Sequence, residues 1–238
     1  MPALTPVSGL TAMVFDFDGT LGRVDIDFDL MRRRVATIAS WFLDPAPTPD
    51  GQPILEWMDE LAELISVRLG KSEAREFHSR ARLAVMAQEL DAAGQGSLFP
   101  EVPGLLRMLG ARGVALGIVT RNTSAAVRLV FPDYEEYGIV LVPREEAVRV
   151  KPDPRHIVQA LELMGGHEPG QALMVGDHPM DIMAGKRAGT LTAGVYAFND
   201  NREALERTGP DFLAPDCRSL IDILEGQGLA AAPGADPE

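Results

Sequence analysis

The chain has 238 residues, 46% of them hydrophobic, so it can bury a sizeable core in one large domain or in a core plus a smaller domain. Its 22 Lys and Arg against 35 Asp and Glu give a net charge of −13, which makes nucleic acid and anionic membrane poor partners. One cysteine, Cys217, excludes an intramolecular disulfide and a thiol cluster for zinc. Because the sequence shows no secretory signal and no apolar run of membrane-spanning length, we expect a cytoplasmic protein.

Five short apolar runs recur along the chain, and nearly all end on polar or glycine-containing turns. Runs of this length are typical of buried strands. Most of them are separated by segments with helical spacing, at 103–109, 124–130, 156–164 and 181–188. Strands that alternate with helices predict an α/β fold with a doubly wound parallel sheet. The apolar runs are residues 12–15, 114–119, 139–142, 172–175 and 191–195.

The interval 22–98 breaks this alternation, because it contains no convincing strand. It holds three helix-compatible stretches instead, at 30–43, 54–69 and 72–90, with a proline-rich link after the first. Trp41, Trp57 and methionines at helical spacing are expected in its core. We therefore predict an inserted all-helical cap domain. The expected division is 1–21 and 99–226 for the catalytic core, 22–98 for the cap and 227–238 for a mobile tail.

Two carboxylates, Asp16 and Asp18, follow the first apolar run. A continuing strand would point both to one side, and Gly19 then permits a sharp turn. Ligands of open parallel sheets bind at the carboxyl ends of the strands. An Asp-x-Asp-Gly run also occurs in calcium loops, but here it follows an apolar strand rather than lying in a ligand-rich loop that ends in Glu. Because neighbouring carboxylates repel, a bound Mg²⁺ is the simplest partner for this pair.

Other strand ends bring further polar residues to the same edge of the predicted sheet. Asp177 and Asp181 follow the run at 172–175, and Thr120 ends the run at 114–119. The next helix opens with capping residues from Asn122 onward, whose backbone N–H groups can face an anion. Lys151 supplies a compact positive charge that can bind phosphate or keep a nucleophile ionised. Together these are the parts that phosphoryl transfer needs.

These motifs resemble those of the haloacid dehalogenase-like hydrolase superfamily, in the helical-cap branch that contains phosphoglycolate phosphatase-like enzymes. The resemblance covers about 11–224, although the cap matches by position rather than by motif. It implies a Rossmann-like core. The matching motifs are Asp16-Phe17-Asp18-Gly19-Thr20-Leu21, Thr120, Lys151-Pro152, and Gly176-Asp177 with Asp181.

The resemblance also implies a role for each motif residue. Asp16 would attack phosphorus and become a phosphoaspartate, and Asp18 would protonate the leaving alcohol and later activate water. Mg²⁺ would be held by Asp16, Asp177 and the backbone carbonyl of Asp18. Thr120 and Lys151 would bind the transferring phosphoryl group. Supporting positions would be Gly19, Thr20, Arg121, Asn122 and Asp181.

A few residues outside the motifs have simpler interpretations. Arg23, like Arg121, is a candidate for a substrate contact because it lies beside a motif. His178 occupies a variable position next to the fourth motif, so a metal or acid–base role is not expected. His156 and His167 are expected at the surface of a helix and of a loop.

The function that these residues favour is a phosphoric monoester hydrolase acting on a small phosphorylated metabolite, such as a phosphoglycolate-like compound or a sugar phosphate. A phosphosugar mutase resembling β-phosphoglucomutase remains the alternative, because it needs the same carboxylates and metal. A dehalogenase needs neither a metal nor an acid at Asp18, and a purely binding module would not need an intact motif set. The cap sequence does not identify the leaving group, and both a monomer and a homodimer are compatible with it.

Overall fold

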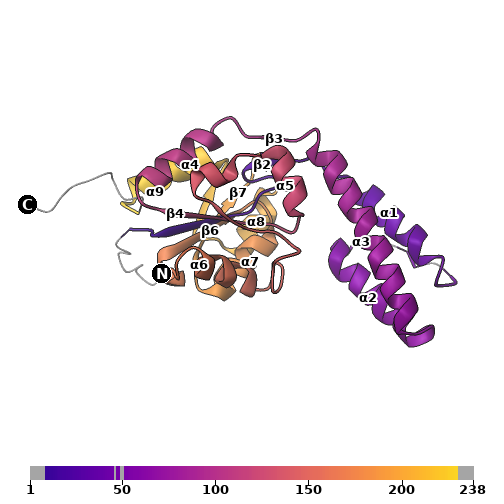
Figure 1. Ribbon diagram of the computed structural model, residues 1–238. Coiled ribbons are helices and arrows are strands. Elements are labelled where there is room, and N and C mark those ends of the chain that lie inside the picture. The colour runs from indigo at the N-terminus through magenta and orange to yellow at the C-terminus, as the bar shows by residue number, and fades with distance from the viewer. Residues whose placement is uncertain (1–8, 46, 49–50, 230–238) are drawn as a thin grey trace, which may run out of the picture. The chain divides into compact units, whose positions relative to one another are not determined.

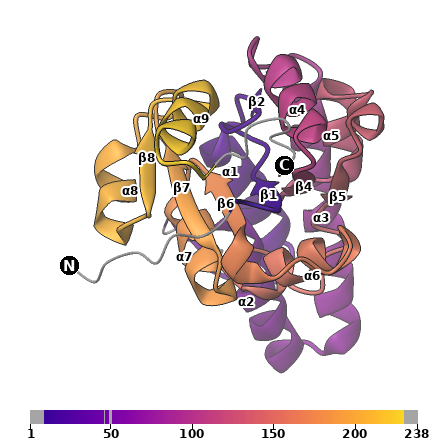
Figure 2. The ribbon, with the colours of Figure 1, turned by 90° about the vertical axis from the view of Figure 1, so that its left-hand side faces the viewer.

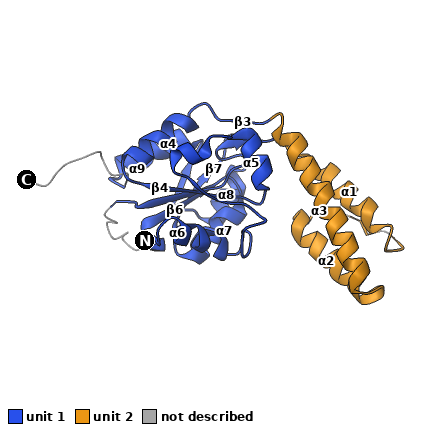
Figure 3. Cartoon of the chain, viewed as in Figure 1, with its two compact units in different colours: residues 1–24, 96–238 blue, residues 25–95 orange. Residues whose placement is uncertain are grey.

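The computed structural model describes residues 9–45, 47–48 and 51–229, in two compact units (Figure 1). Unit 1 comprises Met1–Val24 and Gly96–Glu238, and unit 2 comprises Asp25–Gln95 (Figure 3). The second unit is therefore an insertion in the chain of the first. Most of the tail predicted at 227–238 lies outside the described residues, but Leu229 donates a backbone hydrogen bond to Leu224 at the end of the last helix.

Unit 1 is built on a six-stranded parallel sheet in the order β5-β4-β1-β6-β7-β8. Figure 2 shows the strands in this order from one edge of the sheet to the other. From β1 the chain adds β4 and β5 on one side and then β6, β7 and β8 on the other, so β1 is central. This confirms the predicted doubly wound α/β class. The strands are β1 Ala12–Phe15, β4 Ala115–Val119, β5 Val140–Val142, β6 Ala172–Gly176, β7 Leu191–Val195 and β8 Phe212–Ala214.

Helices cover both faces of this sheet, with α4 and α9 on one face and α6 and α7 on the other (Figure 1). Alternate side chains of a strand point to opposite faces, so a strand covered on both sides must be apolar throughout, as β1 is. Gly185 lets α7 lie close to the sheet, because a Cβ there would come within 2.6 Å of Thr192 Cγ2. The helices are α4 Val102–Ala111, α5 Ser124–Val130, α6 Arg155–Leu163, α7 Pro179–Ala188, α8 Arg202–Thr208 and α9 Cys217–Gly226.

Unit 2 consists of three helices, α1 Phe28–Ala39, α2 Ile54–Arg68 and α3 Lys71–Ala93, which pack around their own apolar cluster. Phe77, in α3, is fully buried in this cluster and meets the ring of Phe42 edge to face, with centroids 6.0 Å apart. None of the described helices in either unit has the length and apolar character needed to cross a bilayer.

Two sequence expectations for the inserted region are wrong. The interval 22–98 does contain strands, because β2 Gly22–Arg23 pairs antiparallel with β3 Ser97–Leu98. Each strand has only two residues, too few to show any periodicity in the sequence. Trp57 is buried as expected, but Trp41 is 61% exposed, with the guanidinium of Arg80 5.4 Å from its ring centroid.

Replacing Phe77 with Ala should lower the free energy of unfolding by about 3–5 kcal/mol, because it removes a fully buried aromatic side chain from a three-helix cluster. Denaturant titration followed by circular dichroism measures the change. Leu83→Ala is the matched control on the same helix, since Leu83 is 60% exposed and its loss should change stability by no more than about 0.5 kcal/mol. Equal effects of the two changes would contradict the packing of unit 2.

Candidate active site

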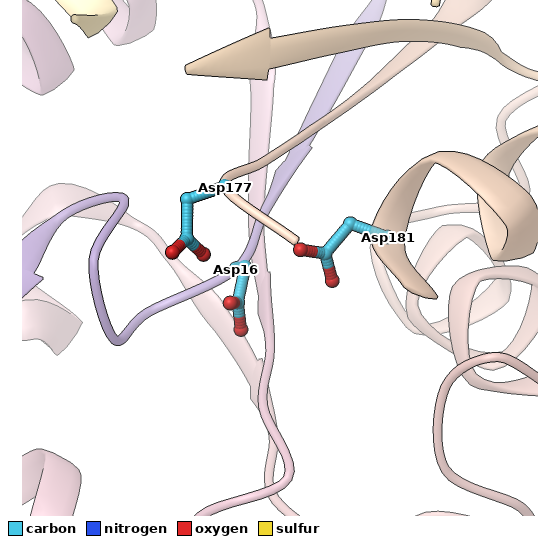
Figure 4. A group of neighbouring side chains, drawn as sticks. All are labelled: Asp16, Asp177 and Asp181. Atoms are coloured by element: carbon cyan, nitrogen blue, oxygen red, sulfur yellow. The ribbon is translucent and has the colours of Figure 1, made fainter. Parts of the chain in front are cut away.

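Three buried carboxylates gather at the carboxyl end of the central strands (Figure 4). Asp16 follows β1, Asp177 follows β6, and Asp181 lies in the first turn of α7. One oxygen from each lies within 4.8 Å of the others. Carboxylates this close together, and buried, are a candidate site for a hard divalent cation.

The local sequence explains how these carboxylates meet. Strands β1 and β6 pair in parallel with Phe15 opposite Val175, and the N–H of Asp16 continues the ladder by donating to Val175 O at 2.8 Å. Gly176 has no side chain, and a Cβ at this position would collide with the carboxyl group of Asp181. Asp181 also accepts a hydrogen bond from the N–H of His178 at 3.0 Å, which anchors it to the start of α7.

Lys151 is the buried cation of the site. Its Nζ lies 2.6 Å from Asp16 Oδ1 and 2.6 Å from Asp181 Oδ1, and its side chain is only 2% exposed. Arg121 holds the backbone of Lys151 in place by donating from Nη1 to its carbonyl oxygen at 2.5 Å. The sequence indicated Lys151 as a charge that could keep a nucleophile ionised and Asp181 as a supporting position, and the structure brings both into contact.

The charges of these groups do not balance. Burial raises the pKa of Asp16 and, more strongly, that of Asp177, and neighbouring carboxylates add to both effects. Burial alone would lower the pKa of Lys151, but the charges of Asp16 and Asp181 outweigh it and raise the pKa. Among the described residues of this cluster, three carboxylates thus share one ammonium group. A divalent cation fits this donor set, because it would supply the two missing positive charges.

Thr120 and Asn122 lie at the end of the neighbouring strand β4. The side chain of Thr120 is fully buried, and its Oγ1 accepts a hydrogen bond from the N–H of Asn122 at 3.0 Å. Asn122 in turn donates from Nδ2 to the carboxylate of Asp18, with the shorter contact at 3.3 Å. The second aspartate of the Asp16 loop is thereby linked to the strand end that carries Thr120.

The start of α5 is not arranged as the sequence suggested. The sequence indicated that its first backbone N–H groups could face an anion; in the structure Thr123 N donates to Asn122 Oδ1 and Ser124 N donates to Glu145 Oε1, both at 2.9 Å. Thr123 Oγ1 caps the helix by accepting from Ala126 N. Side chains of the protein therefore satisfy these groups.

The remaining motif residues support the cluster. Thr20 donates from Oγ1 to Asp177 Oδ1 at a long distance of 3.5 Å. Gly19 has a positive φ of 82°, which glycine adopts without strain. Cys217 donates from its thiol to Thr20 O, and burial raises its pKa to about 12, so the thiol supports the Asp16 loop and is not a nucleophile. Arg23 stacks its guanidinium over the Phe198 ring.

Sequence reasoning missed two asparagines, Asn199 and Asn201, in the connection between β7 and α8. Asn199 Nδ2 donates to Asp177 Oδ2, and Asn201 Nδ2 donates to the backbone carbonyl of Asp177 at 3.2 Å. Their position after a predicted strand, which other site residues share, could have indicated a role in the site. However, no motif of the resembled family marks this position.

His156 is buried rather than on the surface of its helix, which corrects the sequence expectation. Its Nδ1 accepts from Lys151 N at 3.3 Å and its Nε2 lies 2.9 Å from Val142 O. Since a backbone N–H only donates and a carbonyl only accepts, the ring is neutral with its proton on Nε2. Burial and the charge of Lys151 lower its pKa to about 4. The ring therefore positions the backbone that carries Lys151.

His178 and His167, which also lie in unit 1, contact nearby groups. His178 Nδ1 accepts from Met180 N at 3.2 Å and so caps α7, and burial lowers its pKa. His167, expected on a loop surface, is partly buried, with Nδ1 3.1 Å from Thr11 Oγ1.

Comparison with known proteins identifies the family. Residues 13–195 match the family model of the haloacid dehalogenase-like hydrolases, and the chain belongs to this family of enzymes. The match spans both the strand-end cluster and the inserted helices.

Particular relatives agree with this assignment. The chain is 26% identical to a Clostridium perfringens protein named "Putative pyrophosphatase PpaX", over 91% of this chain and 98% of that protein. It is 37% identical to the pyrophosphatase PpaX of Bacillus cereus (strain B4264), but over 50% of this chain and 56% of that protein. In fold it is similar to a predicted phosphoglycolate phosphatase from Haemophilus somnus 129pt, with a TM-score of 0.61, 19% identity and coverage of 90% and 97% of the two chains.

The buried neutral His156 predicts a pH-dependent loss of stability. Its pKa of about 4 in the folded protein lies below the ordinary value of 6.5, so the unfolded chain binds the proton first as the pH falls. The part of the unfolding free energy that depends on a neutral His156 is fully present above pH 6.5. It is lost as the pH falls toward 4, and the loss amounts to up to about 3 kcal/mol. His156→Gln should therefore flatten the fall in unfolding free energy between these pH values, as measured by denaturant titration at each pH.

The matched control is His167→Gln, which removes a partly buried ring. It should leave the pH dependence of the wild-type protein in place. A His156→Gln protein that loses stability between pH 6.5 and pH 4 as steeply as the wild type would contradict the burial and hydrogen bonding of this ring.

Proposed function

We propose that the protein is a Mg²⁺-dependent phosphatase that hydrolyses a small phosphorylated metabolite through a phosphoaspartate on Asp16. The observation that carries the proposal is the contact of Asp16 with Lys151 beside two more buried carboxylates. Burial raises the pKa of Asp16, but the Lys151 ammonium group 2.6 Å away acts in the opposite direction and favours the ionised form, which a carboxylate needs in order to attack phosphorus.

In the first step, an oxygen of Asp16 forms a bond to phosphorus while the bond from phosphorus to the leaving oxygen breaks. Asp18 gives its proton to that oxygen, so the product leaves as an alcohol. Thr120 and Lys151 bind the phosphoryl oxygens, on which negative charge concentrates during transfer. The Thr120 oxygen already accepts from Asn122 N, so its hydroxyl proton can be donated to the phosphoryl group.

In the second step, Asp18 takes a proton from water as the water oxygen attacks phosphorus. The bond between phosphorus and Asp16 breaks, inorganic phosphate leaves, and Asp18 is protonated again for the next cycle. The contact from Asn122 to Asp18 keeps this carboxyl group near Thr120 throughout.

Asp16, Asp177 and the backbone carbonyl of Asp18 would hold the Mg²⁺, with Asp181 in a supporting position. When bound, the cation supplies positive charge for the crowded carboxylates and for the phosphoryl oxygens. The donor set supports this assignment because all of its members are oxygens.

The names of the relatives suggest which substrates to test. Pyrophosphate and phosphoglycolate, which those names print, and the sugar phosphates expected from the sequence all present a phosphoryl group that such a site can accept. The substrate is therefore best sought by comparing kcat/KM over a panel of these compounds, with an aryl phosphate as the generic reference.

Asp16→Asn should abolish release of phosphate from an aryl phosphate in the presence of Mg²⁺, by roughly 10³-fold or more, because the amide is not a nucleophile. Asp133→Asn, at an exposed position in unit 1, is the matched control and should keep wild-type activity. Melting temperatures of all three proteins check folding. The proposal fails if the wild type releases no phosphate from any panel compound, or if Asp16→Asn is as active as the wild type.

The same assay separates the phosphatase from the mutase. A phosphatase releases inorganic phosphate in proportion to the substrate consumed. A mutase would instead return the phosphoryl group to a sugar, so product analysis with sugar phosphates would show an isomeric sugar phosphate and little free phosphate.

Mg²⁺ should stabilise the folded protein even without substrate. If the cation binds only the folded chain, Mg²⁺ at about 100 times its Kd raises the free energy of unfolding by about 2.7 kcal/mol. Asp177→Asn should lose most of this gain, because the change removes one proposed ligand. Unfolding of chelator-treated protein with and without added Mg²⁺ measures the stabilisation of the wild type and of Asp177→Asn. An identical unfolding curve for the wild type in the two conditions would argue against the metal site.

A further inference from the structure

The connection between β7 and α8, residues 196–201, provides a side-chain hydrogen bond to the Asp177 carboxylate. We propose that Asn199 is a positioning residue for the divalent cation: its side-chain amide holds Asp177 in the orientation that binds the ion. The inference rests on the proposed function, in which Asp177 is a ligand. It is carried by the hydrogen bond from Asn199 Nδ2 to Asp177 Oδ2.

The amide is suited to this role because it donates without adding charge. A carboxylate has about four lone-pair sites, so Asp177 can accept from Asn199 on one oxygen and from Thr20 on the other and still have lone pairs for a cation. A donor at this position fixes the orientation of the carboxylate, as partners of metal ligands generally do. A carboxylate in place of the amide would bring another like charge to the cluster.

Gly19 in the first motif makes room for this contact. A Cβ at that position would lie 2.5 Å from Asp177 Oδ2 and 2.6 Å from Asn199 Nδ2, closer than real contacts allow. The Asp16 loop, Asp177 and the connection between β7 and α8 therefore meet at one point, and a side chain on the loop would separate Asn199 from Asp177.

The connection is held in place around Asn199. Phe198 packs edge to face on Phe99, with ring centroids 5.4 Å apart, and Ala197 N donates to Pro215 O at 2.9 Å. Asn201 donates to the Asp177 carbonyl from the other side. The backbone on both sides of Asn199 is therefore held by contacts other than its own hydrogen bond to the Asp177 carboxylate, so the amide can orient that carboxylate.

The test is calorimetric titration of metal-free protein with Mg²⁺. Asn199→Ala should raise the Kd for Mg²⁺ by roughly 10-fold or more, the usual effect of removing a group that orients a metal ligand. Asn199 is exposed outside this contact, so its truncation removes no part of the core. Asp200→Asn, at the next residue, is the matched control, because its side chain is also exposed and asparagine tolerates the positive φ of 50° there.

Kinetics give a second measure of the same effect. Asn199→Ala should need more Mg²⁺ for half-maximal activity but approach the wild-type kcat when Mg²⁺ saturates, whereas damage to the chemical step would lower kcat at every concentration. The inference is overturned if Asn199→Ala binds Mg²⁺ within about 2-fold of the wild-type Kd, since second-sphere partners typically contribute more than that.

The titration also keeps this inference distinct from the proposed function. If the wild type binds Mg²⁺ but hydrolyses no phosphorylated compound, the proposed function fails, and Asn199 is still judged on the measured Kd values. If the wild type hydrolyses substrate and the two Kd values agree, only the inference about Asn199 fails. A wild type that binds no Mg²⁺ at all overturns both.

Discussion

The ammonium group of Lys151 lies between the buried carboxylates of Asp16 and Asp181, and the rest of the site depends on these two ion pairs. A buried charge is costly unless it is paired, and removing Lys151 would leave two acids facing each other away from water. Arg121 and His156 bind the backbone of Lys151 and so fix where its charge falls. These two hydrogen bonds therefore help to place the Lys151 ammonium group between the carboxylates.

The sheet supplies the positions on which these pairs depend. Because β1 is central, with β4 and β6 as its neighbours, residues that follow these three strands meet at a single edge. Glycines then permit contacts that side chains would block, Gly176 beside Asp181 and Gly19 beside Asp177. The site is thus assembled from loop residues that regular, buried strands hold in register, which accounts for its short distances.

Much of the fold could be predicted from the sequence because buried parallel strands leave a clear apolar record, as in the four residues of β1. Acids at strand ends were informative because parallel strands share one edge, so Asp177 could be expected near Asp16 before any coordinates, whereas Lys151 was expected there because Lys151-Pro152 resembles a motif of the family. Family membership follows from the same motifs, which lie within residues 13–195.

The remaining features depend on packing that leaves no local pattern. His156 lies one turn before Ala160 on the inward face of α6, but its polar residue type favoured a surface position, and only the fold shows that its ring is enclosed and bonded on both nitrogens. Asn199 is one of several polar residues in the connection between β7 and α8. Its role depends on its hydrogen bond to Asp177, which is 22 residues away in sequence. The two-residue strands β2 and β3 are too short for any periodicity. Long-range contacts of this kind require coordinates.

Under the proposed function, Asp16 itself receives the phosphoryl group. The most direct measurement is the stereochemical course of hydrolysis of a phosphorothioate ester that carries two different oxygen isotopes on phosphorus, in water enriched in the third isotope, so that the released inorganic thiophosphate is itself chiral. Transfer to Asp16 followed by transfer to water comprises two in-line displacements, so the account predicts retention of configuration at phosphorus. Inversion would mean that water attacks the substrate directly, and it would contradict the role assigned to Asp16.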